Sequence, residues 1–193
     1  MPITYVNAKE KTYYLHQGVT KTGKPKYHFA MKSEGNLADA IPEEYEIYEN
    51  PNAQVFLCRI PPKLITDEER QVVEDGMRAY SDAKDYKIDV KGNTIAIYTA
   101  DQDFDRLVNI ACNPHASVEE NEIRMRLIRE SIHYSDILKF ILEDDQHRTF
   151  MTQRYCFLGS IDDWIYIGKP DMLSSLVKKY VKHIDKESFY ELM

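Results

Sequence analysis

The stretch that decides the fold is YKIDVKGNTIAIYT, residues 86 to 99. Apolar and polar residues alternate on both sides of Lys91-Gly92-Asn93, which is the spacing of strands with one buried face. Glycine and asparagine tolerate the positive φ angles of a tight turn. The stretch therefore predicts an antiparallel hairpin.

More strands are expected after this hairpin. Leu138, Phe140 and Leu142 share one face of a strand, and Asp144-Asp145-Gln146 supplies a turn into a strand over residues 149–158. Residues 123–127, IRMRL, alternate strictly, which favours another strand. Ser117 and Glu120 have the spacing of a helix cap, so a helix is the alternative there.

Three helices are expected around these strands. Thr66 and Glu69 form a capping box for a helix over residues 66–82, and residues 104–111 have the spacing of a short helix. Pro170 is suited to the first position of a third helix, whose apolar stripe runs from Leu173 to Ile184. Hairpins grouped with hairpins predict an α+β fold, an antiparallel sheet with helices on one face.

A small β unit is predicted before this sheet. Residues 13–16 and 26–30 flank a turn-forming stretch at 20–25, and residues 45–48 and 54–58 form a second such pair. Pro61-Pro62 marks a rigid junction, since prolines do not donate to a strand ladder. The expected domains are a basic β unit at 1–62 and an α+β domain at 63–193.

Composition indicates a globular chain of the cytoplasm. The hydrophobic fraction is 43%, no apolar run approaches the roughly 18 residues of a membrane span, and the first residues lack the pattern of a secretory leader. No membrane partner is expected. Cys58, Cys112 and Cys156 are far apart, which predicts reduced thiols and no disulfide.

Charge is distributed unevenly along the chain. The net charge is −7, but residues 1–32 carry six lysines against Glu10 alone, a net of +5, so the remaining residues carry −12. Lysines and aromatic rings together form the elements of a polyanion-binding surface, ammonium groups for phosphates and ring faces for unpaired bases. The candidate residues are Lys21, Lys24, Lys26, Tyr14 and Tyr27. The alternative is a solvated turn over a packed sheet.

Trp164 is the only tryptophan and follows Asp162 and Asp163. One interpretation has either aspartate capping a short helix, with the tryptophan packed in the core. The other makes Trp164 an anchor for a protein partner, because exposed tryptophans are often interface hot spots.

No metal site or cofactor is expected. Residues 101–105 begin like a calcium loop, but Arg106 occupies the glycine position and Cys112 that of the bidentate glutamate. Cys112 and His115 have the spacing of half a zinc site, and the second half is missing.

No catalytic residues are assigned, because the sequence has no nucleophile elbow, phosphate-binding glycine loop or dinucleotide fingerprint. The alternative from the enzyme class is a metal-dependent hydrolase of nuclease type. It would use Asp89 and Lys91, an acid-x-lysine pattern, with Asp101, Asp103 and Glu74.

Three strings, KTGKPKYHF at 21–29, IPEEYEIYENPN at 41–52 and GSIDDW at 159–164, resemble a group of bacterial proteins of unknown function. That group has glycine where this chain has Glu44 and Ala53. The resemblance spans most of the chain and implies no activity, ligand or site residue.

These observations favour a non-catalytic binding or regulatory protein, whose basic β unit contacts nucleic acid or an acidic partner. The alternatives are the hydrolase and a protein-only adaptor or oligomer.

Overall fold

The computed structural model describes residues 1–113 and 115–193, apart from the side chain of Leu158. Contacts divide the chain into two compact units, Met1–Pro61 and Pro62–Met193. The division into domains at 1–62 and 63–193 stays a prediction, and each unit is described by itself.

The predicted fold class is confirmed. The described residues form four α-helices and ten strands, and all the strand pairs are antiparallel. Within this part of the chain, no helix has the length and apolar character needed to cross a membrane.

Unit 1 consists of two small sheets. A three-stranded sheet has the order β1-β2-β3, and a two-stranded sheet pairs β4 with β5. Leu15, Ala38, Ala53 and Val55 are buried within it. The bounds are β1 Thr4–Val6, β2 Thr12–Val19, β3 Pro25–Ala30, β4 Tyr45–Glu49 and β5 Val55–Arg59.

Three non-glycine residues of unit 1, Glu10, Glu44 and Ala53, have a left-handed backbone that favours glycine. Glu44 has φ 66° and Ala53 has φ 62°, where side chains with a Cβ are strained.

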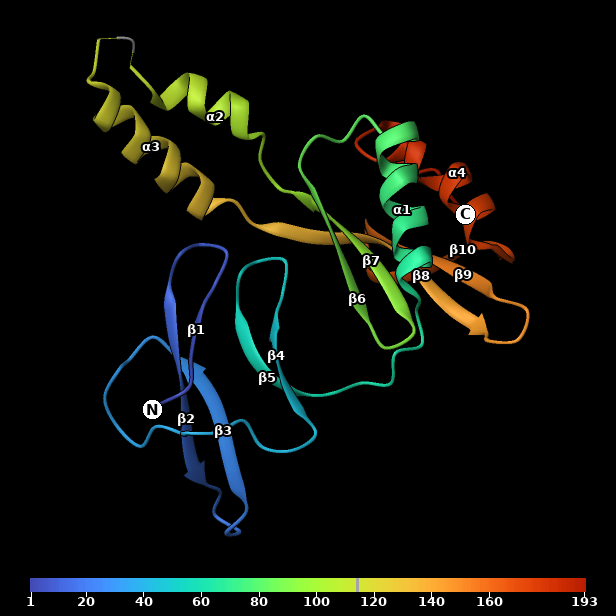
Figure 1. Ribbon diagram of the computed structural model, residues 1–193. Coiled ribbons are helices and arrows are strands. Elements are labelled where there is room, and N and C mark those ends of the chain that lie inside the picture. Colours follow the sequence, from blue (N-terminus) through green and yellow to red (C-terminus); the bar gives the residue numbers. More distant parts are fainter. Residues whose placement is uncertain (114) are drawn as a thin grey trace. The chain divides into compact units, whose positions relative to one another are not determined.

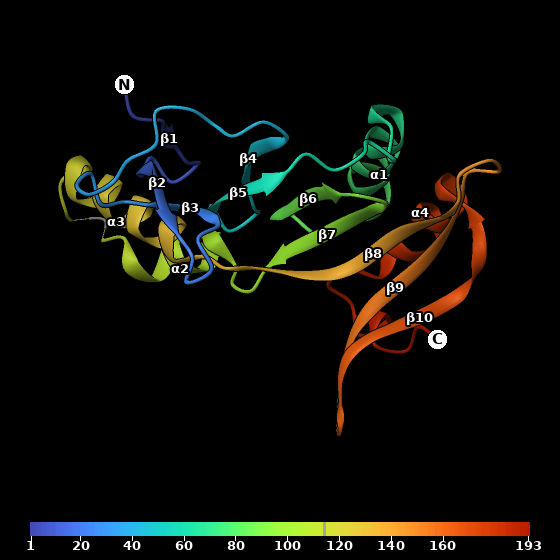
Figure 2. The ribbon, with the colours of Figure 1, turned by 90° about the horizontal axis from the view of Figure 1, so that it is seen from below.

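Unit 2 is built on a five-stranded sheet in the order β10-β9-β8-β7-β6, so each strand pairs with its neighbour in sequence (Figure 2). The hairpin predicted from residues 86–99 is its edge, and Ile88 pairs with Ile97. The bounds are β6 Tyr86–Lys91, β7 Thr94–Ala100, β8 Tyr134–Asp144, β9 Thr149–Leu158 and β10 Ile161–Met172.

Helices α1, Asp67–Tyr80, and α4, Leu173–Tyr180, pack against each other and share the core of this sheet. The capping box of Thr66 and Glu69 is present at the start of α1. Val73 and Met77 from α1, and Leu176 and Val177 from α4, are buried with sheet residues such as Phe140. The core thus lies on one face of the sheet.

The strand predicted at residues 123–127 is wrong. This segment lies in α3, Val118–Ser131, which starts with a capping box of Ser117 and Glu120. The apolar residues alternate because the helix has apolar groups on two sides: Met125 is half-buried, whereas Leu127 is exposed. Helix α2, Phe104–Ala111, forms as predicted, with Asp103 as its N-cap.

Two predictions around β10 are also wrong. Asp162 and Asp163 do not cap a helix, because they lie in β10 directly after the turn that contains Gly159. Pro170 also lies in this strand, and α4 begins at Leu173. The register of β10 is irregular between Ile167 and Asp171, a place where a strand tolerates a proline.

Candidate functional site

The lysine-rich turn joins β2 to β3 and is closed by its own hydrogen bonds. The amide of Thr20 donates to the carbonyl of Lys24 at 2.8 Å, and the amide of Gly23 donates to the carbonyl of Thr20 at 2.9 Å. Gly23 has φ 79°, which glycine adopts without strain. In Figure 1 this turn lies at the end of unit 1 opposite to the turns that join β1 to β2 and β4 to β5.

The three lysines of the candidate site, Lys21, Lys24 and Lys26, are all exposed. Among residues 1–113 and 115–193, no carboxylate forms an ion pair with any of them. Unit 1 as a whole has seven basic and seven acidic side chains, so its net charge is zero. Any attraction for an anion therefore depends on the local charge at this turn.

The two candidate tyrosines lie on different faces of the sheet. Tyr27 pairs with Gln17, and Lys26 pairs with Gly18. Because side chains alternate between faces along a strand, Tyr14 shares a face with Lys26, while Tyr27 points to the other face with Leu15. Lys26 and Tyr14 therefore share a face, although Tyr14 pairs with Ala30, four residues along β3 from Lys26, and Tyr27 lies on the opposite face.

A histidine pair that the sequence did not indicate lies on the face of Lys26. His16 and His28 are cross-strand partners, and their rings stack with centres 5.2 Å apart. His16 Nε2 is 2.9 Å from the carbonyl oxygen of Lys32. Only the register of β2 on β3 brings these two residues together, so no local sequence signal could have found them.

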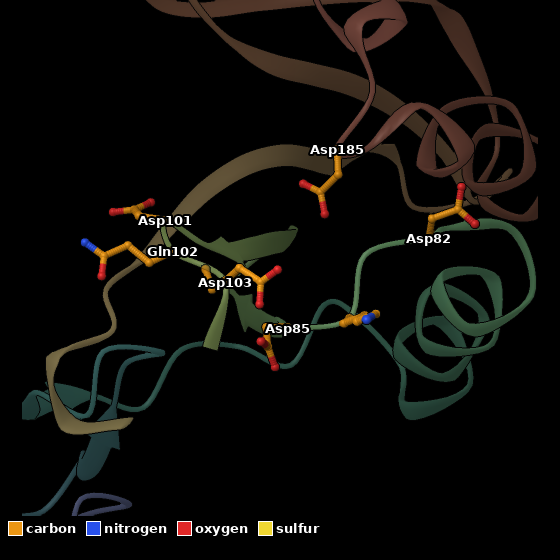
Figure 3. Close-up of a pocket in the computed structure, with 8 residues that line it drawn as sticks. Asp82, Asp85, Asp101, Gln102, Asp103 and Asp185 are labelled. Atoms are coloured by element: carbon orange, nitrogen blue, oxygen red, sulfur yellow. The ribbon is translucent and has the colours of Figure 1, made fainter. Parts of the chain in front are cut away.

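Unit 2 contains an acidic pocket of about 320 Å³ (Figure 3). Three parts of the chain surround it: the loop after α1, the C-terminal end of β7 with the residues that follow it, and the segment after α4. Its lining residues are Asp82, Lys84, Asp85, Ala100, Asp101, Gln102, Asp103 and Asp185.

The aspartates of this pocket do not converge on one point. Asp82 pairs with Lys186 at 2.8 Å, and Asp103 accepts a hydrogen bond from the amide of Arg106 as the cap of α2. Partial burial raises the pKa of Asp185. Within the described residues, no group of three or more histidine, cysteine or acidic side chains could hold a metal ion.

Trp164 lies on the sheet face opposite the core. It pairs with Tyr155 across β9 and β10, and the two rings meet edge to face with centres 5.5 Å apart. The Nζ of Lys139 is 3.5 Å from the centre of the indole ring and 2.8 Å from the Asp136 carboxylate. The tryptophan is thus half-buried beneath a lysine rather than packed in the core.

Aromatic side chains continue across this face, which we call the aromatic face: Tyr98, Tyr155, Phe157, Trp164 and Tyr166. Phe157 is 76% exposed and Tyr166 is 59% exposed. Partial burial, with added repulsion from Asp136 and Asp89, raises the pKa of Tyr98 to about 12. Two rings of the aromatic face, those of Phe157 and Tyr166, are thus uncovered.

The residues of the hydrolase alternative are dispersed in the structure. Asp89 lies in β6 on the aromatic face and pairs with Ala96, while Asp101 and Asp103 line the acidic pocket. The described residues thus give the hydrolase alternative no assembled metal site.

Cys58, Cys112 and Cys156 are free thiols.

No family model, curated protein or solved structure matches this chain.

Proposed function

We propose that the chain is a non-catalytic binding protein that contacts a polyanion, most simply single-stranded nucleic acid, through the turn between β2 and β3. The observation that carries the proposal is the set of Lys21, Lys24 and Lys26, three exposed ammonium groups with no carboxylate partner among the described residues.

In this proposal each group has a role. Lysines on a protruding turn reach phosphates without desolvating the sheet, and each phosphate contact releases condensed counterions. The ring of Tyr14 lies on the face of Lys26, where it offers a stacking surface for one unpaired base. Tyr27 is the residue of the original candidate set that would contribute least, because it points to the opposite face.

Replacing Lys21, Lys24 and Lys26 together by alanine is expected to weaken binding to a fluorescent single-stranded oligonucleotide at low salt by at least about tenfold. Fluorescence anisotropy measures the effect. Three exposed lysines of unit 2, Lys169, Lys178 and Lys182, supply the matched control, because their replacement changes the net charge equally. Equal losses in both triple variants would show that only net charge matters, and no binding by the wild-type chain at low salt would remove the proposal.

A second candidate function, binding of a protein partner, is favoured by the aromatic face. Phe157 and Tyr166 are large side chains left uncovered next to Trp164, and apolar rings grouped on one face are typical of interfaces. A partner that offers apolar side chains would cover both rings at once.

We expect the double variant Phe157→Ser with Tyr166→Ser to lose a protein that the wild-type chain retains in an affinity pull-down. Losing the two rings removes apolar contact area, and each buried aromatic ring is worth on the order of 2 kcal/mol. The control is Tyr80→Ser with Ile110→Ser, which removes exposed apolar side chains elsewhere on unit 2. An identical set of retained proteins for wild type and the Phe157/Tyr166 variant would contradict this candidate.

A further inference from the structure

Helices α2 and α3 follow β7 and precede β8 in the chain, and they form a hairpin that projects from the sheet of unit 2 (Figures 1 and 2). Neither helix contains a buried residue. Helices of globular proteins obtain most of their stability by burying an apolar face. This hairpin therefore lacks the buried apolar face that stabilises most helices of its length.

One side of α3 is occupied by α2. The Arg124 guanidinium donates to the carbonyl of Ala111 at 3.2 Å, and the Asn121 amide donates to the carbonyl of Asn113 at 3.0 Å. Met125 and Ile128 lie on this same side and are half-buried. The opposite side of α3 faces outward.

The outward side of α3 has an apolar strip next to a stripe of charges. Ile123 and Leu127, one turn apart, are 44% and 57% exposed. Beside them the charged residues recur at spacings of three and four, so a helix of 3.6 residues per turn aligns them. In order along the helix they are Glu119, Glu122, Arg126 and Arg129.

These four charges form no ion pair among the described residues, even though Glu122 and Arg126 have the spacing of a helical pair. Arg129 does contact a ring, since its guanidinium lies 5.2 Å from the centre of Phe104. All four remain exposed. Two negative charges are thus followed by two positive charges along one exposed side of α3, and only Arg129, at the end of the stripe, also contacts α2.

We infer that this face binds the α3 of a second copy of the chain in the antiparallel direction. Glu119 and Arg129 have the same midpoint in sequence as Glu122 and Arg126, namely Arg124. A twofold axis that crosses the outward side of α3 at the level of Arg124 would place each acid of one copy opposite an arginine of the other. The Glu119–Arg129 pair and the Glu122–Arg126 pair would each occur twice. Such a self-complementary patch is what a twofold homodimer requires.

The same stripe disfavours other occupants. A parallel second copy would set acids against acids and arginines against arginines, and a polyanion would meet Glu119 and Glu122. The apolar strip of Ile123 and Leu127 lies beside the charged stripe in both copies. It adds the water-excluding contact that ion pairs on a surface need, since each such pair alone contributes little.

Charge exchange between two variants tests the dimer. Glu119→Arg with Glu122→Arg makes the stripe wholly basic, and Arg126→Glu with Arg129→Glu makes it wholly acidic. Sedimentation velocity of the full chain should show a concentration-dependent dimer for wild type and dimerisation weakened by at least about tenfold for each variant alone. An equimolar mixture of the two variants should recover the dimer.

Circular dichroism establishes that each variant keeps its helices. A wild-type chain that stays monomeric up to its solubility limit would overturn the inference. A dimer that survives in both variants would do the same, because it would use another surface, and the Phe157/Tyr166 variant would then show whether that surface is the aromatic face. A mixture that fails to associate would likewise overturn it.

Discussion

Replacing Arg154 with methionine is expected to lower the free energy of unfolding of unit 2 by about 3 kcal/mol. Arg154 is only 3% exposed. Its Nε donates to the carbonyl of Leu192 at 2.8 Å, and its Nη2 donates to the carbonyl of Tyr190 at 2.9 Å. Methionine fills similar space without donors, so these carbonyls lose their partners and residues 190–193 should separate from the sheet.

Urea denaturation followed by circular dichroism measures the loss, and hydrogen exchange at residues 190–193 shows whether the segment separates. Arg70→Met is the control: Arg70 is exposed on α1 and pairs with Glu74, and such a surface pair contributes about 0.5 kcal/mol. Equal losses for the two arginines would mean that burial of Arg154 has no special role in stability.

The second large effect is expected at Gly76, in the middle of α1. A Cβ added there would lie 2.0 Å from Cγ1 of Val177 on α4. Alanine is normally more favourable than glycine inside a helix by about 1 kcal/mol, but overpacking of this kind costs about 1 to 3 kcal/mol. Because the contact with Val177 is so close, we expect the upper end of that cost, which leaves a net loss of about 2 kcal/mol in the free energy of unfolding of Gly76→Ala, as read from urea midpoints.

A double-mutant cycle separates the contact from the effect on the helix. Val177→Ala alone leaves a cavity and should destabilise the unit, by about 2 kcal/mol. Combined with Gly76→Ala, its cost should shrink, since the added methyl group fills the space that valine left. Strictly additive losses would be evidence that the two helices do not approach each other as closely as described.

The parts of the fold that were predictable are those where one local signal has no competitor. Alternation around Gly92 specified the β6–β7 hairpin, and the capping box of Thr66 and Glu69 specified the start of α1. Helix α3 was missed because Ile123, Met125 and Leu127 alternate with arginines, and because the helix buries neither side. The alternation of apolar and polar residues therefore favoured a strand, although the capping box of Ser117 and Glu120 correctly indicated a helix.

Tertiary context explains the other differences. Pro170 suits the first turn of a helix, but the irregular register of β10 accommodates it within a strand. Gly76 weakened the sequence evidence for α1, because glycine is unfavourable inside a helix. The structure explains this glycine by the close approach of Val177, a residue 101 positions away along the chain.

The candidate sites divide in the same way. The exposed position of Lys21, Lys24 and Lys26 at a turn could be predicted, because the composition of the stretch is typical of turns; their role in binding stays a proposal. The faces of Tyr14 and Tyr27, and the stacking of His16 on His28, depend on strand register, which no short motif encodes. The aromatic face depends on the alignment of Tyr98, Tyr155 and Trp164, which come from three different strands.

The salt dependence of oligonucleotide binding tests the central claim most directly. For single-stranded nucleic acid the logarithm of the binding constant falls with the logarithm of salt concentration, by about 0.7 for each phosphate contact. Three contacts made by Lys21, Lys24 and Lys26 predict that the triple alanine variant has a slope shallower than wild type by about 2, while the unit 2 control keeps the wild-type slope. Identical slopes for wild type and the triple variant would contradict the account.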